Sequence, residues 1–201
     1  MNCIVLKGSY HKNGYISSLV KNFINGLKEN NKGLKAEIID LMDKNINFCR
    51  GCLKCNSDNG ESLGKCNQND DMQNILKKMV EADILVYASP IYQFTITALF
   101  KKFNERTMPV LFRSKKSPFP QPRNKIKKGK KGVVLLSTGA PFPFNVLFGM
   151  TKYAKKIFFL FCRAFGCEKN FILQAGGVGN EKMKNQYLNK AFNLGLKVGV
   201  I

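Results

Sequence analysis

The sequence lacks any apolar run close to the roughly 20 residues that span a bilayer, so a membrane-spanning helix is excluded. It also lacks a charged segment at its start, where the apolar stretch is only four residues long, so we expect no secretory signal. What is present, 201 residues of which 44% are hydrophobic and 23% charged, suits one globular domain over residues 1–201. These numbers exclude collagen-like, disordered and small disulfide-rich proteins.

Acidic residues are absent between Glu105 and Glu168, a span that holds 14 of the lysines and arginines of a chain with net charge +20. Such a block repels itself unless an anionic group lies near it. A nucleotide, an acidic protein, anionic lipid or nucleic acid would fit, and a solvated basic face would fit equally well. No DNA-reading motif accompanies the block, so we expect no nucleic-acid partner.

Cysteine is plentiful for a chain without an export signal, and its count of seven is odd. We therefore predict a reducing, cytoplasmic compartment in which thiols serve metal or redox chemistry. Cys3, Cys162 and Cys167 are expected to be buried as small apolar side chains. Four more lie in a polar, glycine-rich loop over residues 43–69, and they are Cys49, Cys52, Cys55 and Cys66. Two successive C-x2-C steps resemble the start of a [4Fe–4S] ligand run; free thiols or a disulfide are the main alternatives, and zinc is less favoured.

Hydrophobic spacing predicts five strands that alternate with five helices. The expected strands are residues 3–6, 35–41, 83–88, 132–136 and 170–174. The expected helices are residues 16–27, 70–80, 95–106, 145–165 and 181–197. This alternation predicts a three-layer α/β sandwich around a five-stranded parallel sheet of order 2-1-3-4-5, with ligands at the carboxyl edge of the sheet. The basic, proline-rich residues 113–131 are predicted to form a long mobile loop.

The turn after the first strand, GSYHKNGYIS, is neither a dinucleotide G-x-G-x-x-G pattern nor a Walker loop. It nevertheless combines two glycines and several hydroxyl side chains with the start of a helix, which suits a phosphate. A second candidate is SPIYQF at the end of the third strand, where Tyr92 and Phe94 offer flat faces to a planar ring. An ordinary polar loop and a core-packing aromatic pair are the respective alternatives.

These two motifs together with NDDM and ASPIYQFTITALFKKFNER resemble the NAD(P)H-dependent FMN reductase family, whose members are flavodoxin-like. FCRGCLKC followed by GKCNQNDDM resembles the cysteine-bearing branch of that family, which includes the iron–sulfur flavoproteins. The resemblance is clear over roughly residues 1–110. It implies bound FMN, NAD(P)H as co-substrate and electron transfer to an unidentified small-molecule or protein acceptor. A non-catalytic flavin or iron–sulfur electron carrier that works with protein partners is the alternative.

The resemblance also implies which residues bind FMN. The candidates for the phosphate are Ser9, His11, Lys12, Ser17 and Ser18. The candidates for the flavin ring are Pro90, Ile91, Tyr92 and Gln93, and those of a third loop are Ser137, Thr138, Gly139 and Ala140. His11 stands where the family usually has arginine, and Ile16 where a hydroxyl residue is common. We assign no catalytic side chain, because the flavin supplies the chemistry.

The predicted helix after Pro143 is basic and amphipathic, since Lys152, Lys155, Lys156 and Arg163 lie along one side. Such a helix is typical of contact with an anionic membrane surface. Packing on the sheet and in a subunit contact is the interpretation we favour, and the family resemblance implies a dimer or a tetramer.

Overall fold

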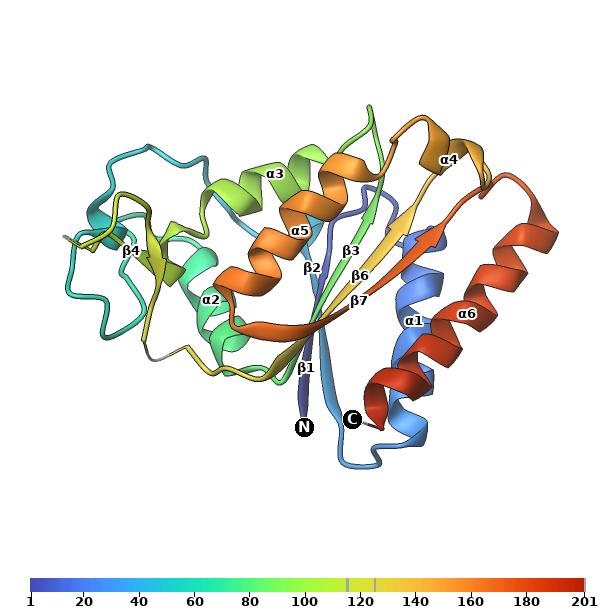
Figure 1. Ribbon diagram of the computed structural model, residues 1–201, viewed down its shortest axis with the longest axis horizontal. Coiled ribbons are helices and arrows are strands. Elements are labelled where there is room, and N and C mark those ends of the chain that lie inside the picture. The colour runs from blue at the N-terminus through green and yellow to red at the C-terminus, as the bar shows by residue number, and fades with distance from the viewer. Residues whose placement is uncertain (115, 125, 201) are drawn as a thin grey trace.

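A central parallel sheet of five strands organises the computed structural model, which describes residues 1–114, 116–124 and 126–200 (Figure 1). The strand order is β2-β1-β3-β6-β7. The strands are β1 (Asn2–Lys7), β2 (Lys35–Asp40), β3 (Ile84–Pro90), β6 (Lys130–Ser137) and β7 (Cys167–Ala175). Since β6 and β7 are the fourth and fifth strands of this sheet, the predicted order 2-1-3-4-5 is confirmed.

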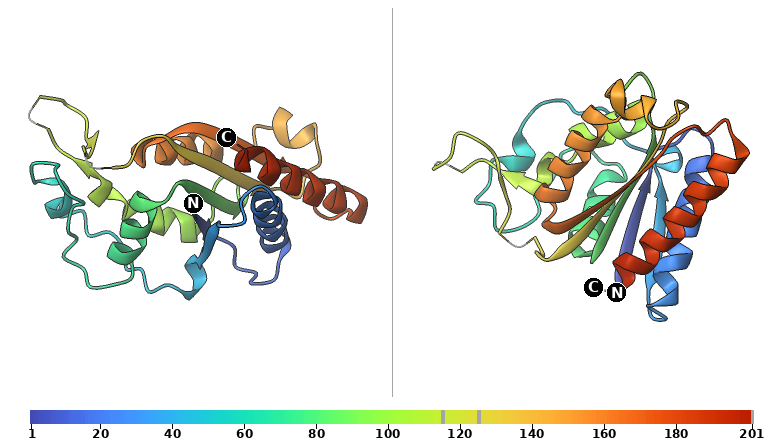
Figure 2. Two further views of the ribbon diagram at one scale, coloured as in Figure 1. Left: turned by 90° about the horizontal axis from the view of Figure 1, so that it is seen from below. Right: turned by 45° about the vertical axis from the view of Figure 1, so that its right-hand side comes forward.

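Helices cover both faces of the sheet, as a three-layer sandwich requires (Figures 1 and 2). One face carries α1 (Tyr15–Glu29) and α6 (Glu181–Gly199), and the other carries α2 (Met72–Glu81), α3 (Ala98–Glu105) and α5 (Lys152–Ala164). A separate apolar core fills the space on each side. Among the short elements are α4 (Phe144–Leu147) and the 3-10 turns Leu41–Asp43, Lys54–Asn56 and Met108–Val110. No helix in these described ranges is both long and apolar enough to cross a bilayer.

Helices α1 and α6 pack closely because each presents a glycine to the backbone of the other. A Cβ atom on Gly26 would lie 2.0 Å from the carbonyl oxygen of Phe192, and one on Gly195 would lie 2.2 Å from that of Phe23. The apolar face of α1 fits its sequence spacing, since Ile16, Leu19 and the apolar residues that follow at helical intervals are buried. Because this packing fixes the position of α1, it also fixes the position of the turn that precedes α1.

The prediction of one helix over residues 145–165 is wrong. The chain forms the four-residue helix α4 and then the separate helix α5. Gly149 lies between them with φ +63°, a left-handed conformation that a continuing helix does not adopt. Apolar spacing alone missed this break, because the residues on both sides of Gly149 remain apolar.

The predicted loop over residues 113–131 contains short ordered elements in its described part. Gln121–Pro122 forms β5, which pairs with β4 (Leu111–Phe112) in a short antiparallel ribbon. Arg123 is buried, and residues 130–131 already belong to β6. Positions 115 and 125 lie outside the described residues.

Two of the lysines in this basic stretch bind helix ends instead of solvent. The Lys130 ammonium donates to the carbonyl oxygens of Met79 and Val80 at the end of α2, and Lys131 donates to that of Val198 at the end of α6. A cation is favourable there, because the carboxyl end of a helix carries partial negative charge. Burial lowers the pKa of Lys130 to about 8.

Candidate functional site

Three loops meet in one groove at the carboxyl edge of the sheet, above β1, β3 and β6. The groove encloses about 170 Å³. Of the predicted cofactor residues, those that line it are Ser9, His11, Pro90, Ile91, Tyr92, Ser137, Thr138 and Gly139. Gly14, Tyr15, Ile16 and Val178 line it as well. Because pockets for small molecules are usually 300–1,000 Å³, a mononucleotide would extend beyond this groove across its open mouth.

The first wall of the groove is the turn between β1 and α1. Gly14 precedes the helix in extended conformation and provides no side-chain cap, and the first helical turn holds no acidic residue. The N–H groups of Tyr15 and Ile16, which precede the first backbone hydrogen bond of α1 from Ser17 to Gly14, are therefore open to an anion beside Ser9 and His11. A Cβ atom on Gly14 would lie 2.8 Å from the Cβ of His11, so the turn needs glycine at this position.

Lys12, Ser17 and Ser18 do not line the groove. The Lys12 ammonium points to Asp43, 2.7 Å away, and this exposed pair raises the pKa of Lys12. The Ser17 hydroxyl donates to the backbone oxygen of Lys12 at 2.5 Å, which ties the turn to the helix. Ser18 accepts at its backbone oxygen from the side chain of Asn22. Lys12 and Ser17 thus stabilise the turn from outside the groove, whereas Ser18 lies within α1.

Lys7 is a buried cation beneath the turn that the sequence analysis missed. Its ammonium lies 2.6 Å from Asp40 and donates to the backbone oxygen of Lys12 at 2.9 Å and to the Ser17 hydroxyl at 3.2 Å. The sequence does contain a signal for such a buried cation, because Lys7 is a charged residue directly after an apolar strand. Its contacts hold the turn in shape and bring a positive charge below the candidate phosphate site.

The second wall is the tight turn after β3. Gln93 and Phe94 both adopt positive φ angles, +47° and +62°, and the backbones of Tyr92 and Thr95 exchange two hydrogen bonds of 3.1 Å. Left-handed backbone at two successive residues other than glycine is strained, and such strain gathers at ligand sites. Gln93 does not line the groove, whereas the exposed ring of Tyr92 stacks on Tyr10 with 6.1 Å between centroids and 3° between planes.

The third wall is the loop after β6. The Thr138 hydroxyl donates to the backbone oxygen of Ala140, and the buried amide of Asn145 donates to the Thr138 hydroxyl at 3.4 Å. Apart from its two chain neighbours, no described residue has a heavy atom within 4 Å of where a Cβ on Gly139 would be, so there is open space beside this glycine. A ligand with a phosphate and a planar ring, such as FMN, fits these features together. They are the N–H donors at the start of α1, the flat Tyr10–Tyr92 pair and the open space beside Gly139.

A second, smaller cavity of about 30 Å³ lies in the cysteine-rich loop. Cys49, Cys52, Cys55 and Cys66 all line it, beside apolar residues such as Met108. All seven cysteines are free thiols, and the three predicted to be buried are buried. Burial raises the pKa of Cys55. Four thiols around one apolar cavity are the donor set that an iron–sulfur cluster takes. In the described part of the chain no three potential ligands are grouped closely enough to hold a single metal ion.

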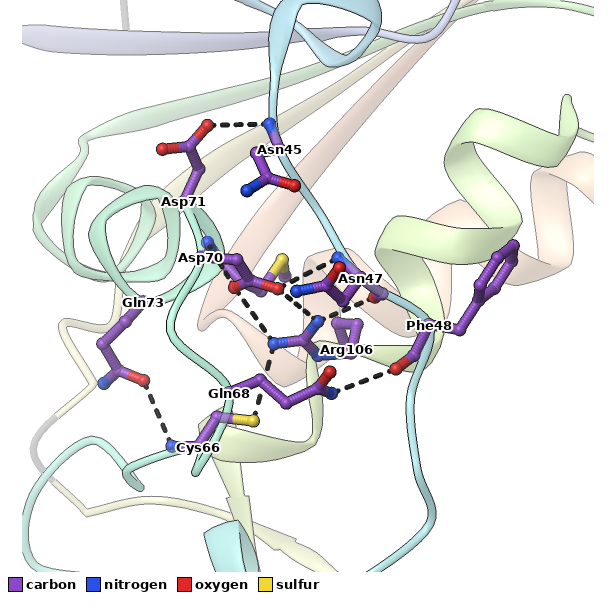
Figure 3. A network of polar contacts seen from close by, with 10 residues as sticks. Asn45, Asn47, Phe48, Cys66, Gln68, Asp70, Asp71, Gln73 and Arg106 are labelled. Atoms are coloured by element: carbon purple, nitrogen blue, oxygen red, sulfur yellow. Dashed lines mark hydrogen bonds and ion pairs between the residues drawn. The ribbon is translucent and has the colours of Figure 1, made fainter.

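Two buried arginines that the sequence analysis missed fix this loop. Arg106, just after α3, forms a fully buried ion pair with Asp70 at 2.6 Å and also contacts Cys66 (Figure 3). Arg123 donates to the backbone oxygens of Cys55, Ser62 and Pro109 and to the carboxylate of Asp58. Both arginines come from the basic span that looked like a solvated face in the sequence.

The family model described as NADPH-dependent FMN reductase matches residues 1–140. An iron–sulfur flavoprotein of Methanocaldococcus jannaschii is 36% identical over 110 residues, which is 55% of this chain and 53% of that protein. An iron–sulfur flavoprotein of Archaeoglobus fulgidus is 29% identical over 198 residues, which is 98% of this chain and 79% of that protein. The chain thus spans about half the length of the Methanocaldococcus jannaschii protein and 79% of the Archaeoglobus fulgidus protein.

Solved structures share the fold. An NAD(P)H:quinone oxidoreductase from Methanothermobacter marburgensis aligns with a TM-score of 0.76 at 19% identity, over 98% of this chain and 96% of that one. An FMN-dependent NADH-azoreductase from Bacillus anthracis, solved in complex with FMN, aligns with a TM-score of 0.74 at 15% identity, over 98% of each chain. At these identities the likeness concerns the flavodoxin-like fold alone. The family match over residues 1–140 identifies the chain itself: it belongs to the NADPH-dependent FMN reductase family.

Proposed function

We propose that this protein is an FMN-dependent oxidoreductase that takes electrons from NADH or NADPH and passes them to an acceptor. The observation that carries this proposal is the convergence of three loops, after β1, β3 and β6, in one groove. The chemistry that FMN supplies when bound is uptake of a hydride from a nicotinamide and release of the electrons to an acceptor. The protein then has to bind, orient and shield the flavin.

The turn before α1 would bind the phosphate, with Ser9, His11 and the first N–H groups of the helix as donors. Each hydrogen bond to a charged group contributes about 1.5–3 kcal/mol. The ammonium groups of Lys7 and Lys12 are both paired with aspartates, Lys7 with Asp40 below the turn and Lys12 with Asp43 outside it. Because Lys7 is buried and donates to the backbone of Lys12 and the hydroxyl of Ser17, we assign to it the role of holding the phosphate-binding turn in shape.

Pro90, Ile91 and Tyr92 would position the planar ring, opposite Thr138 and Gly139. The N–H of Ile91 donates to the backbone oxygen of Ser137 at 2.8 Å, which joins two of the three loops and keeps that donor from a ligand. The exposed Tyr10–Tyr92 pair lies at the groove and offers a flat apolar surface. Gln93 acts through the shape of the strained turn.

We further propose that the cysteine cavity holds a [4Fe–4S] cluster ligated by Cys49, Cys52, Cys55 and Cys66. The support is the shared cavity, the four thiols that line it and the iron–sulfur flavoproteins among the relatives. A cluster accepts and donates single electrons, so it would connect a two-electron flavin to a one-electron acceptor.

A self-contact through residues 142–148 is part of the proposal. Phe142, Phe144, Leu147 and Phe148 are all more than half exposed, and Figure 2 shows α4 projecting from the body of the molecule. Exposed apolar groups gathered in this way mark an interaction surface, and a dimer or tetramer would cover them. Light scattering after gel filtration tests this: Phe148→Ser shifts the mass toward one chain, and an unchanged mass contradicts the assignment.

The activity is tested by adding FMN to flavin-free protein and then mixing it anaerobically with NADH or NADPH in a stopped-flow instrument. We expect one FMN per chain and rapid bleaching of the flavin band. Gly14→Ala weakens FMN binding about tenfold, because the new Cβ disturbs His11 in the turn. Gly33→Ala, in a loop with open space around the glycine, serves as the matched control and leaves binding unchanged.

Two other outcomes would revise the proposal in different ways. Failure to bind FMN would contradict the flavin site itself. Tight FMN binding with bleaching that is slow for both nicotinamides would favour the alternative function, an electron carrier that exchanges electrons with protein partners.

A further inference from the structure

Arg106 makes a hydrogen bond to a sulfur atom of the cysteine cavity. Its Nη2 lies 3.5 Å from the Sγ of Cys66 (Figure 3). Cys66 is the only one of the four cavity cysteines that receives a side-chain hydrogen bond at its sulfur within the described residues. The guanidinium is itself buried, with its side chain 1% exposed. An arginine in this position is a permanent positive charge next to one thiol.

The orientation of Arg106 is fixed by three further contacts. Nη1 lies 2.6 Å from one carboxylate oxygen of Asp70 and Nη2 lies 3.1 Å from the other, a two-point geometry. Nη1 also donates to the backbone oxygen of Asn47 at 2.7 Å. With these directions occupied, the remaining donor direction of Nη2 is aimed at Cys66.

Asp70 is in turn held as a carboxylate. Burial alone would raise the pKa of Asp70, but hydrogen bonds from Arg106 and from the N–H groups of Asn47 and Met72 outweigh it and lower the pKa. Cys66 has a second fixed point, since its N–H donates to the side chain of Gln73 at 3.4 Å. The sulfur and the cation thus stand in a rigid frame that links the end of α3, the start of α2 and the loop that precedes α2 (Figure 3).

A buried cation beside a cluster ligand has a defined electrical effect. A cluster held by four thiolates is negatively charged, and reduction adds one more negative charge. Hydrogen bonds to the sulfurs and the local net charge are established determinants of the reduction potential. A fixed guanidinium stabilises the reduced state more than the oxidised state, because the interaction grows with the negative charge and is weakly screened when buried.

We propose that Arg106 is a positioning residue that orients the Cys66 sulfur and raises the reduction potential of the cluster in this cavity. The inference rests on the proposed cluster. The inference adds that Cys66 is the ligand through which the protein adjusts the reduction potential of the cluster. It also adds that the negative charge of Asp70 limits this adjustment.

The chain offers a matched control in Arg123. This arginine is also 1% exposed, also pairs with an aspartate and also binds the cysteine-rich loop. Its four contacts in that region are the carboxylate of Asp58 and the backbone oxygens of Cys55, Ser62 and Pro109, all of them oxygen atoms. Replacing Arg123 therefore disturbs the loop without removing a hydrogen bond to sulfur.

The test compares wild-type protein with Arg106→Lys, Arg123→Lys and Asp70→Asn, all purified anaerobically. Iron and sulfide are quantified, and the cluster midpoint potential is measured by redox titration followed by electron paramagnetic resonance. Lysine keeps a charge beside Asp70 but loses the bond to Cys66, so Arg106→Lys lowers the potential by about 59 mV, equivalent to a tenfold change for one electron. Asp70→Asn removes a nearby negative charge and shifts the potential upward.

The outcomes separate the inference from the function on which it rests. Arg123→Lys loosens the loop, but its shift in midpoint potential relative to the wild type is expected to be only a small fraction of the Arg106→Lys shift. A cluster present in Arg106→Lys at the wild-type potential overturns the inference and leaves the cluster in place. A wild-type protein without iron and sulfide overturns the cluster and the inference together, while its FMN content still reports on the flavin site. A shift of equal size in Arg123→Lys also overturns it, because any loosening of the loop would then suffice.

Discussion

The groove above the sheet and the cysteine cavity beside it are built in opposite ways. The groove is formed by backbone turns at the ends of three parallel strands, so the sheet itself brings Ser9, Pro90 and Thr138 together. The cysteine-rich loop lies outside the sheet (Figure 1), and the buried side chains of Arg106 and Arg123 hold it. Parallel sheet topology is sufficient to place the first site, whereas the second depends on a few ion pairs and hydrogen bonds.

The largest expected effect comes from removing one partner of the buried ion pair in the cavity. Asp70→Leu leaves the Arg106 charge buried without its carboxylate, and breaking such a pair costs about 3–5 kcal/mol. Urea unfolding followed by circular dichroism measures the loss in the free energy of unfolding. The cysteine-rich loop should also become sensitive to proteolysis before the sheet does.

Glu37→Gln is the matched control for this prediction. It breaks the pair between Lys78 and Glu37, whose side chains are 50% and 47% exposed. Exposed pairs contribute roughly 0–1 kcal/mol, so its unfolding curve should stay close to that of the wild type. Equal losses in the two variants would contradict the claim that the buried pair stabilises the cavity.

Acid should reproduce part of this effect without a substitution. Since the pKa of Asp70 is lower in the folded protein than its unfolded value of about 3.9, the carboxylate stabilises the fold fully above that pH. This contribution is lost as the pH falls through the folded pKa. The difference in unfolding free energy between wild type and Asp70→Asn should therefore shrink below about pH 3.9, and a difference that stays constant down to pH 2 would refute the assignment.

A substitution under the groove should cost less, because backbone turns carry most of that site. The buried hydroxyl of Thr97 donates to the backbone oxygen of Gly8 at 2.9 Å and accepts from the N–H of Phe100 at the start of α3. Thr97→Ala removes this cap, at a cost of about 1–2 kcal/mol. Urea unfolding and FMN titration are the measurements. A loss as large as that of Asp70→Leu would remove the contrast between the two sites.

The same contrast explains what the sequence predicts and what it does not. The alternation of apolar strands and helices is a local pattern, and parallel topology converts it into a shared edge, so the strand order and the three loops follow from it. Gly149 breaks a helix whose apolar spacing continues across it. Arg106 and Asp70 are separated by 36 residues, and Arg123 and Cys55 by 68, so no local pattern relates them. From the sequence alone, a charged residue in a basic stretch is expected to face solvent, because its buried partner is not apparent.

The most direct test of the account is the visible absorption spectrum of anaerobically purified protein, taken with flavin, iron and sulfide analysis. The account predicts flavin bands from one FMN per chain, together with broad iron–sulfur absorption that dithionite bleaches. A colourless protein that also fails to take up added FMN would contradict the central claim that the three loops form a flavin site.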